Sequence, residues 1–134
     1  MPPLTGKACV PSSDPVTRIE DIRRAIMRIG DYVAKAGGVE ALLMSDNELY
    51  DGVERRLMII SEAAVKLGGV AESLEPTIAW RDIRGLGNAL RHAYDSVNHD
   101  VIRAVLAAHL PPLDAACGRM LTTLSREADG GDGG

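Results

Sequence analysis

The stretch 14-DPVTRIEDIRRAIMRIGDYVAKAGG-38 holds the strongest structural signal in the chain. Asp14 followed by Pro15 predicts the start of a helix, because an aspartate caps the first free N–H groups and proline tolerates the first helical position. Apolar side chains then recur every three or four residues, at Ile19, Ile22, Ile26, Ile29 and Val33. Gly37-Gly38 is typical of a helix end. The stretch therefore predicts an amphipathic helix with one apolar side to bury.

The same pattern continues along the chain. Ser45-Asp46-Asn47-Glu48 has the spacing of a capping box and predicts a second helix, which ends at Gly68-Gly69. A third helix is expected from about residue 77 or 80 to 94, a fourth from 98 to a stop before Pro111-Pro112, and a fifth beyond these prolines. No stretch alternates as a strand would. The sequence predicts an all-α fold, an antiparallel bundle of four to five helices.

Composition narrows the class of protein. The chain has 134 residues, 46% of them apolar, but no apolar run of about 20 residues that would span a membrane. The first residues lack the pattern of a signal peptide, so a cytoplasmic protein is expected. A net charge of −4 argues against a broadly electrostatic nucleic-acid binder but leaves room for a local basic patch.

The predicted domain covers residues 14–127. Residues 1–13 are rich in proline and serine, and residues 128–134 are rich in glycine and aspartate, so both ends are expected to be disordered. Cys9 and Cys117 lack metal-site spacing and are expected to be reduced. We expect no metal and no cofactor.

The segment 80-WRDIRGLGNALRHAY-94 carries the candidate chemistry. On a helical wheel Asn88 and His92 share one side, and Arg84 and Arg91 flank them, while the core residues fall opposite. Histidine moves protons near neutral pH and arginine binds phosphate, so this side predicts a site for a phosphate-bearing ligand. The alternative interpretation is the ordinary solvated side of a bundle helix.

The order of residues in this segment resembles the HepT-like toxins of the HEPN superfamily. The resemblance covers roughly residues 17–125, with Ser61 standing where the family has glycine. Its motif is carried by Trp80, Ile83, Gly85, Asn88, Leu90, His92, Tyr94, Asp95, Val97 and Leu110-Pro-Pro-Leu113.

The resemblance implies a homodimeric helical bundle that cleaves RNA without metal. The family motif is Arg-x4-His-x-Tyr, which implies His92 as a catalytic residue and Tyr94 as the residue to which an antitoxin transfers AMP. Asn88 keeps the polar position that follows the motif arginine, and it is implied as a second catalytic residue. The implied partner is a nucleotidyltransferase (MNT-like) antitoxin, and the substrate is RNA. The motif arginine is replaced by Gly87. Arg84 and Arg91 are the candidate phosphate-binding residues that would compensate.

Gly87 keeps two other interpretations open. The chain could be a HEPN subunit or regulator that has lost ribonuclease activity, or a plain helical adaptor without an active site. The retained Asn88, His92 and Tyr94 favour the ribonuclease.

Overall fold

The computed structural model describes residues 14–45, 48–92 and 95–133, without the side chains of residues 92, 95–97 and 130–133. The described residues are almost entirely helical and include no strand, which confirms the all-α prediction. The helices are α2 (Pro15–Ala36), α3 (Val39–Leu43), α4 (Glu48–Leu67), α5 (Gly69–Leu74), α6 (Trp80–His92), α7 (Asp95–Ala104), the π-helical η2 (Val105–His109) and α8 (Leu110–Gly133). None of them is both long and apolar enough to cross a membrane.

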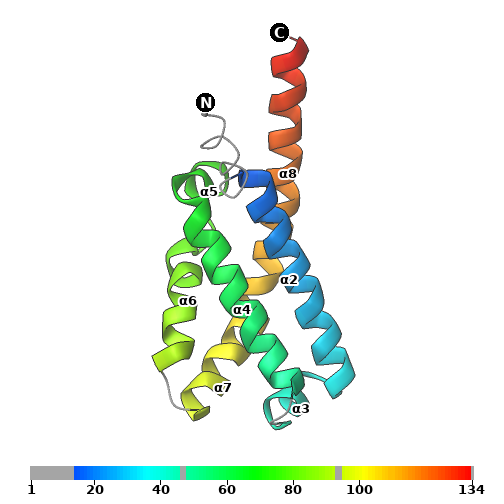
Figure 1. Ribbon diagram of the computed structural model, residues 1–134, viewed down its shortest axis with the longest axis vertical. Helices are drawn as coiled ribbons and strands as arrows, with labels where there is room; N and C mark the ends of the chain where they lie inside the picture. The colour runs from blue at the N-terminus through cyan, green and yellow to red at the C-terminus, as the bar shows by residue number, and fades with distance from the viewer. Residues whose placement is uncertain (1–13, 46–47, 93–94, 134) are drawn as a thin grey trace, which may run out of the picture.

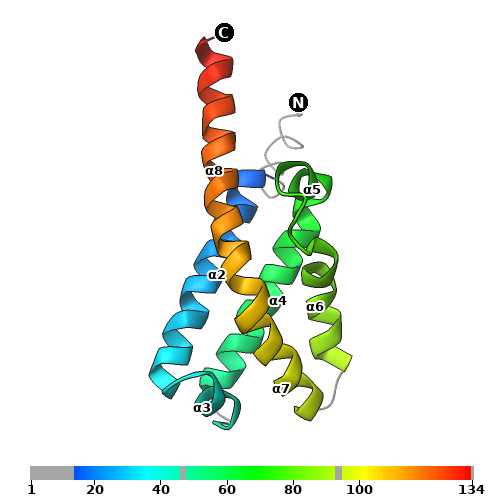
Figure 2. The same ribbon diagram turned by 180° about the vertical axis from the view of Figure 1, so that it is seen from behind.

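The long helices run alternately in opposite directions, as Figures 1 and 2 show. α4 lies between α2 and α6 and packs against both, while α8 packs against α2. The stripe residues Ile19, Ile22 and Leu57 are fully buried. Burying one such side chain contributes about 1.5–3 kcal/mol, so the predicted stripes hold the bundle together.

Both ends of α2 lie where the sequence predicts them. The Asp14 carboxylate accepts a hydrogen bond from the Val16 N–H at 3.1 Å, and Gly37 ends the helix with a φ of 97°. That left-handed conformation suits glycine because it has no Cβ. Ser45 differs from its predicted capping role: its hydroxyl donates to the Leu42 carbonyl at 2.6 Å and so closes α3.

One predicted boundary was wrong. α7, η2 and α8 follow one another without a break, so the helix does not stop before Pro111-Pro112. Proline in a helix clashes with the carbonyl four residues earlier. Here a wider π turn precedes Pro111, in which the Leu110 N–H donates to the carbonyl of Val105, five residues earlier. α8 continues through Gly133 and projects beyond the bundle in both views (Figures 1 and 2). Residues 1–13 lie outside the described residues.

Candidate functional site

The helix α6 has the two sides that the wheel predicts. Trp80 is 1% exposed, and Ile83 and Leu90 are buried with it. The Trp80 indole N–H donates to the Glu75 carbonyl at 2.9 Å, which fixes the start of the helix. Because this side is held in the core, the opposite side, with Asn88 and Arg91, is exposed.

Arg84 is bound within the protein. Its Nε donates to the Ala64 carbonyl at 3.1 Å and its Nη2 to the Gly68 carbonyl at 2.8 Å. Both Nη atoms also contact the Glu72 carboxylate, at 2.6 and 2.8 Å. These hydrogen bonds lower the pKa of Glu72 and raise that of Arg84. The guanidinium of Arg84 therefore joins α6 to α4 and α5, and it has little capacity left for a ligand.

Arg91 has a different position. A Cβ atom placed on Gly87 would lie 3.8 Å from Nη2 of Arg91. Helical side chains point toward the preceding turn, so the guanidinium at position 91 reaches back over position 87. Arg91 is exposed, and the described residues include no ion pair to it. A guanidinium that makes no ion pair with another described residue thus lies beside the place where the motif arginine would begin.

Ser61 packs closely against Gly87. The Ser61 hydroxyl donates to the Arg84 carbonyl at 2.7 Å and accepts from the Gly87 N–H at 3.1 Å. A Cβ atom on Gly87 would be only 3.2 Å from Ser61 Oγ. Both residues are buried. Ser61 and the absence of a side chain at position 87 therefore belong to one close contact between α4 and α6.

A small cavity of about 200 Å³ opens between these helices. It is lined by Met58, Ser61, Glu62, Val65, Arg84, Gly87, Asn88 and Arg91. The structure brings together three of the predicted site residues here: Arg84, Asn88 and Arg91. His92 ends α6 next to Arg91, but its side chain is not described, and Tyr94 lies outside the described residues. An exposed guanidinium and an amide beside a hollow can bind a phosphate.

The α4 residues of this cavity were missed in the sequence. Met58, Glu62 and Val65 lie off the predicted apolar stripe of α4, on the side that faces α6. The one sequence feature that pointed to this part of α4 was Ser61, which departs from the family pattern as Gly87 does. Periodicity alone does not show that the two positions touch.

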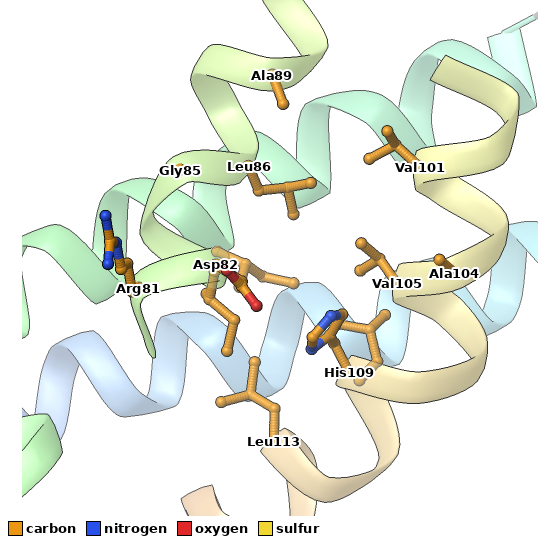
Figure 3. Close-up of a pocket in the computed structure, with 13 residues that line it drawn as sticks. Arg81, Asp82, Gly85, Leu86, Ala89, Val101, Ala104, Val105, His109 and Leu113 are labelled. Atoms are coloured by element: carbon orange, nitrogen blue, oxygen red, sulfur yellow. The ribbon is translucent and has the colours of Figure 1, made fainter. Parts of the chain in front are cut away.

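A second cavity, of about 430 Å³, lies between α6 and the α7–η2–α8 segment (Figure 3). Leu86, Val105 and Leu113 point into it, and so do the polar side chains of Asp82 and His109 (Figure 3). Its walls are mainly apolar, so it offers few groups for a phosphate. Among the described residues, no group of three or more His, Cys, Asp or Glu side chains could hold a metal ion.

The chain was compared with known proteins. The sequence model of the family described as "HepT-like: Ribonuclease HepT-like" matches residues 22–120. The matched region runs from α2 into α8 and includes both α4 and α6. Searches of curated proteins and of solved structures gave no match.

Proposed function

The chain belongs to the HepT-like ribonuclease family, and from this premise we propose that it is an endoribonuclease that cleaves RNA without a metal ion. One observation carries the proposal. The exposed guanidinium of Arg91 lies beside Gly87, where the family motif has its arginine. Arg91 would therefore supply, from one helical turn later, the positive charge that the motif arginine supplies in the family.

The proposed reaction is a transfer of the phosphate within the RNA strand. The 2′-hydroxyl oxygen attacks the neighbouring phosphorus, loses its proton to a base, and the bond to the 5′-oxygen breaks as that oxygen takes up a proton. The His92 imidazole is the proposed proton carrier, because histidine titrates near neutral pH. Arg91 stabilises the charge that builds on the phosphate oxygens, and Asn88 donates a hydrogen bond to them.

We further propose that the protein acts as a cytoplasmic homodimer. Two copies of α6 near a two-fold axis would supply two His92 side chains, one to remove a proton and one to donate a proton. The proposed antitoxin is a nucleotidyltransferase that transfers AMP to Tyr94. The added phosphate would repel RNA beside His92 and so inhibit the toxin. Intact mass after co-expression with the antitoxin tests this step, with Tyr94→Phe as the control.

The test of the proposed activity is RNA cleavage in EDTA by protein purified free of any partner. We expect Arg91→Ala to reduce the rate about 100-fold or more, the usual effect of removing one such donor. Arg24→Ala removes an exposed arginine from α2 and should leave the rate unchanged. His92→Ala should abolish cleavage. EDTA-resistant cleavage that survives His92→Ala would refute the mechanism.

A second candidate function is a HEPN subunit or regulator without ribonuclease activity. The contact between Ser61 and Gly87 favours it, because a side chain at the motif position would press against the Ser61 hydroxyl. Absence of cleavage by the partner-free wild-type protein would support this candidate over the first.

A further inference from the structure

A second group of basic side chains lies on the other side of α4, where α2 packs against it (Figure 1). Tyr32 of α2 is at the centre of this group and is half-buried. Its ring lies against Gly52 of α4, where an added Cβ atom would be only 2.9 Å from Cε2 of the ring. This close contact holds the phenol at a fixed place between the two helices.

Two arginines reach the phenol oxygen from the two helices. Arg56 lies one turn after Gly52 on α4, and Arg28 lies one turn before Tyr32 on α2. Hydrogen bonding to these guanidiniums, first to Arg56 and then to Arg28, lowers the pKa of Tyr32. The surroundings of the phenol oxygen therefore stabilise negative charge.

The two guanidiniums have no carboxylate to neutralise them among the described residues. No ion pair between described residues involves Arg28, Lys35 or Arg56. Arg84 differs, because the Glu72 carboxylate and two backbone carbonyls accept its hydrogen bonds. A guanidinium has five N–H donors, and one neutral phenol oxygen can accept few of them. The pair of arginines thus keeps both charge and donors for an anion.

The surface of α2 beside these arginines has room for a ligand. Arg28, Tyr32 and Lys35 line a hollow of about 400 Å³, together with Asp31 and Ala34. Spacings of four and three residues place the first three on one side of the helix. Arg28 and Lys35 are both exposed, so solvent reaches their charges. The lining holds two cations and one carboxylate, which favours an anionic ligand.

We propose that Arg28, Tyr32 and Arg56 bind a phosphate group on the surface between α2 and α4. The guanidiniums would donate hydrogen bonds to the phosphate oxygens, and the phenol O–H would donate a further one. The oxygens of a phosphate are arranged as a tetrahedron, which suits donors that come from two helices. A carboxylate has only two oxygens in one plane and fits these donors less well.

The phosphate belongs either to the backbone of an RNA strand or to a free nucleotide, and both present the same chemistry. The proposed site lies along the α2 side of α4, whereas Asn88 and Arg91 line the cavity on its α6 side. A helix with its side chains is about 10–12 Å across, so an RNA strand would cross only one helix to contact both places. The function proposed above does not use this site.

The test follows the backbone ¹⁵N NMR signals of Arg28, Tyr32 and Gly52 at constant ionic strength. Uridine monophosphate, 2′-O-methyl tetrauridylate and succinate are titrated separately. The methyl groups block the 2′-hydroxyls, so the oligonucleotide cannot be cleaved. We expect both phosphate probes to shift the signals saturably and succinate to bind at least about tenfold more weakly. Tighter binding of the oligonucleotide indicates RNA as the source, and tighter binding of uridine monophosphate indicates a free nucleotide.

The matched variants are Arg28→Gln and Arg126→Gln. Each removes one exposed guanidinium, but Arg126 lies near the C-terminal end of α8. Arg28→Gln should weaken binding of the tighter phosphate probe about tenfold, and Arg126→Gln should leave it unchanged. Tyr32→Phe keeps the ring on Gly52 and removes only the O–H, so it should weaken binding about threefold or more.

Three results would each overturn the proposal: no saturable shift, succinate bound as tightly as the phosphate probes, or an unchanged affinity in Arg28→Gln. The second result would indicate an acidic protein partner instead. The signals of Asn88 and Arg91 report the other cavity separately, so a failure at either place can be recognised. The readout is binding, and the result is therefore independent of whether the protein cleaves RNA.

Discussion

Restoring an arginine at position 87 is the sharpest perturbation that the structure suggests. The side chain in Gly87→Arg would begin 3.2 Å from Ser61 Oγ, closer than about nine in ten real Cβ contacts, so the hydroxyl would have to move aside. The hydroxyl would then lose its hydrogen bonds to the Arg84 carbonyl and the Gly87 N–H. At about 0.5–1.5 kcal/mol each, the two bonds are worth about 1–3 kcal/mol.

The magnitude of the coupling follows from counting these bonds. Gly87→Arg loses both hydrogen bonds of the Ser61 hydroxyl. It regains about 1 kcal/mol of helix stability, because glycine is a poor helix former. Ser61→Gly loses the same two bonds and adds an unfavourable glycine to α4. The double variant Ser61→Gly/Gly87→Arg loses the bonds only once and has room for the arginine. Its free energy of unfolding should therefore exceed the additive expectation by about 1–3 kcal/mol.

Urea denaturation followed by circular dichroism measures this coupling, and Gly85→Arg is the matched control. Gly85 lies on the same helix, and a Cβ atom there would meet nothing within 4 Å. The effects of Gly85→Arg and Ser61→Gly on the free energy of unfolding should be additive. Additivity of Ser61→Gly and Gly87→Arg to within about 0.5 kcal/mol would refute the reasoning. RNA cleavage by the same proteins tests the role of Arg91, because a gain of about 100-fold in the double variant would show that the wild type lacked a donor.

Three further predictions concern stability and reactivity. Arg84→Ala should lower the free energy of unfolding by about 1–3 kcal/mol in urea denaturation, because it leaves acceptors in α4 and α5 without a donor; unchanged stability would contradict the anchoring role. The hydrogen bond from Arg84 lowers the pKa of Glu72, so its contribution is complete above the unfolded-state pKa and is lost as pH falls through the lower folded-state value. The stability difference between wild type and Glu72→Gln should therefore disappear in acid, and a difference that persists there would exclude the ion pair as its cause. Burial raises the pKa of Cys117 to about 12. In a Cys9→Ser background, iodoacetamide should thus label the folded protein far more slowly than the urea-unfolded protein at mildly alkaline pH, as mass spectrometry would show.

The helices were predictable because their apolar period is a local property. Asp14, Pro15 and Gly37 mark the ends of α2 in the sequence, and the structure uses them as expected. The prolines at 111–112 misled the prediction for a physical reason. Proline excludes a regular α-helical turn, but the hydrogen bonds of a π turn reach back five residues and accommodate it. Nothing in the pattern of apolar residues distinguishes a helix that ends from one that widens.

The candidate site was predictable only as one side of a helix. Arg84 and Arg91 flank that side equally on a wheel, so periodicity gives no reason to prefer either as the phosphate-binding residue. The structure separates them through Glu72, which lies on α5, a short helix that the sequence did not predict. Glu72 and two backbone carbonyls bind Arg84, which is only 24% exposed, whereas Arg91 stays exposed beside Gly87. The availability of an arginine for a ligand depends on which acceptors the fold places around it. For this chain, that dependence makes Arg91 the residue whose removal best tests the proposed activity.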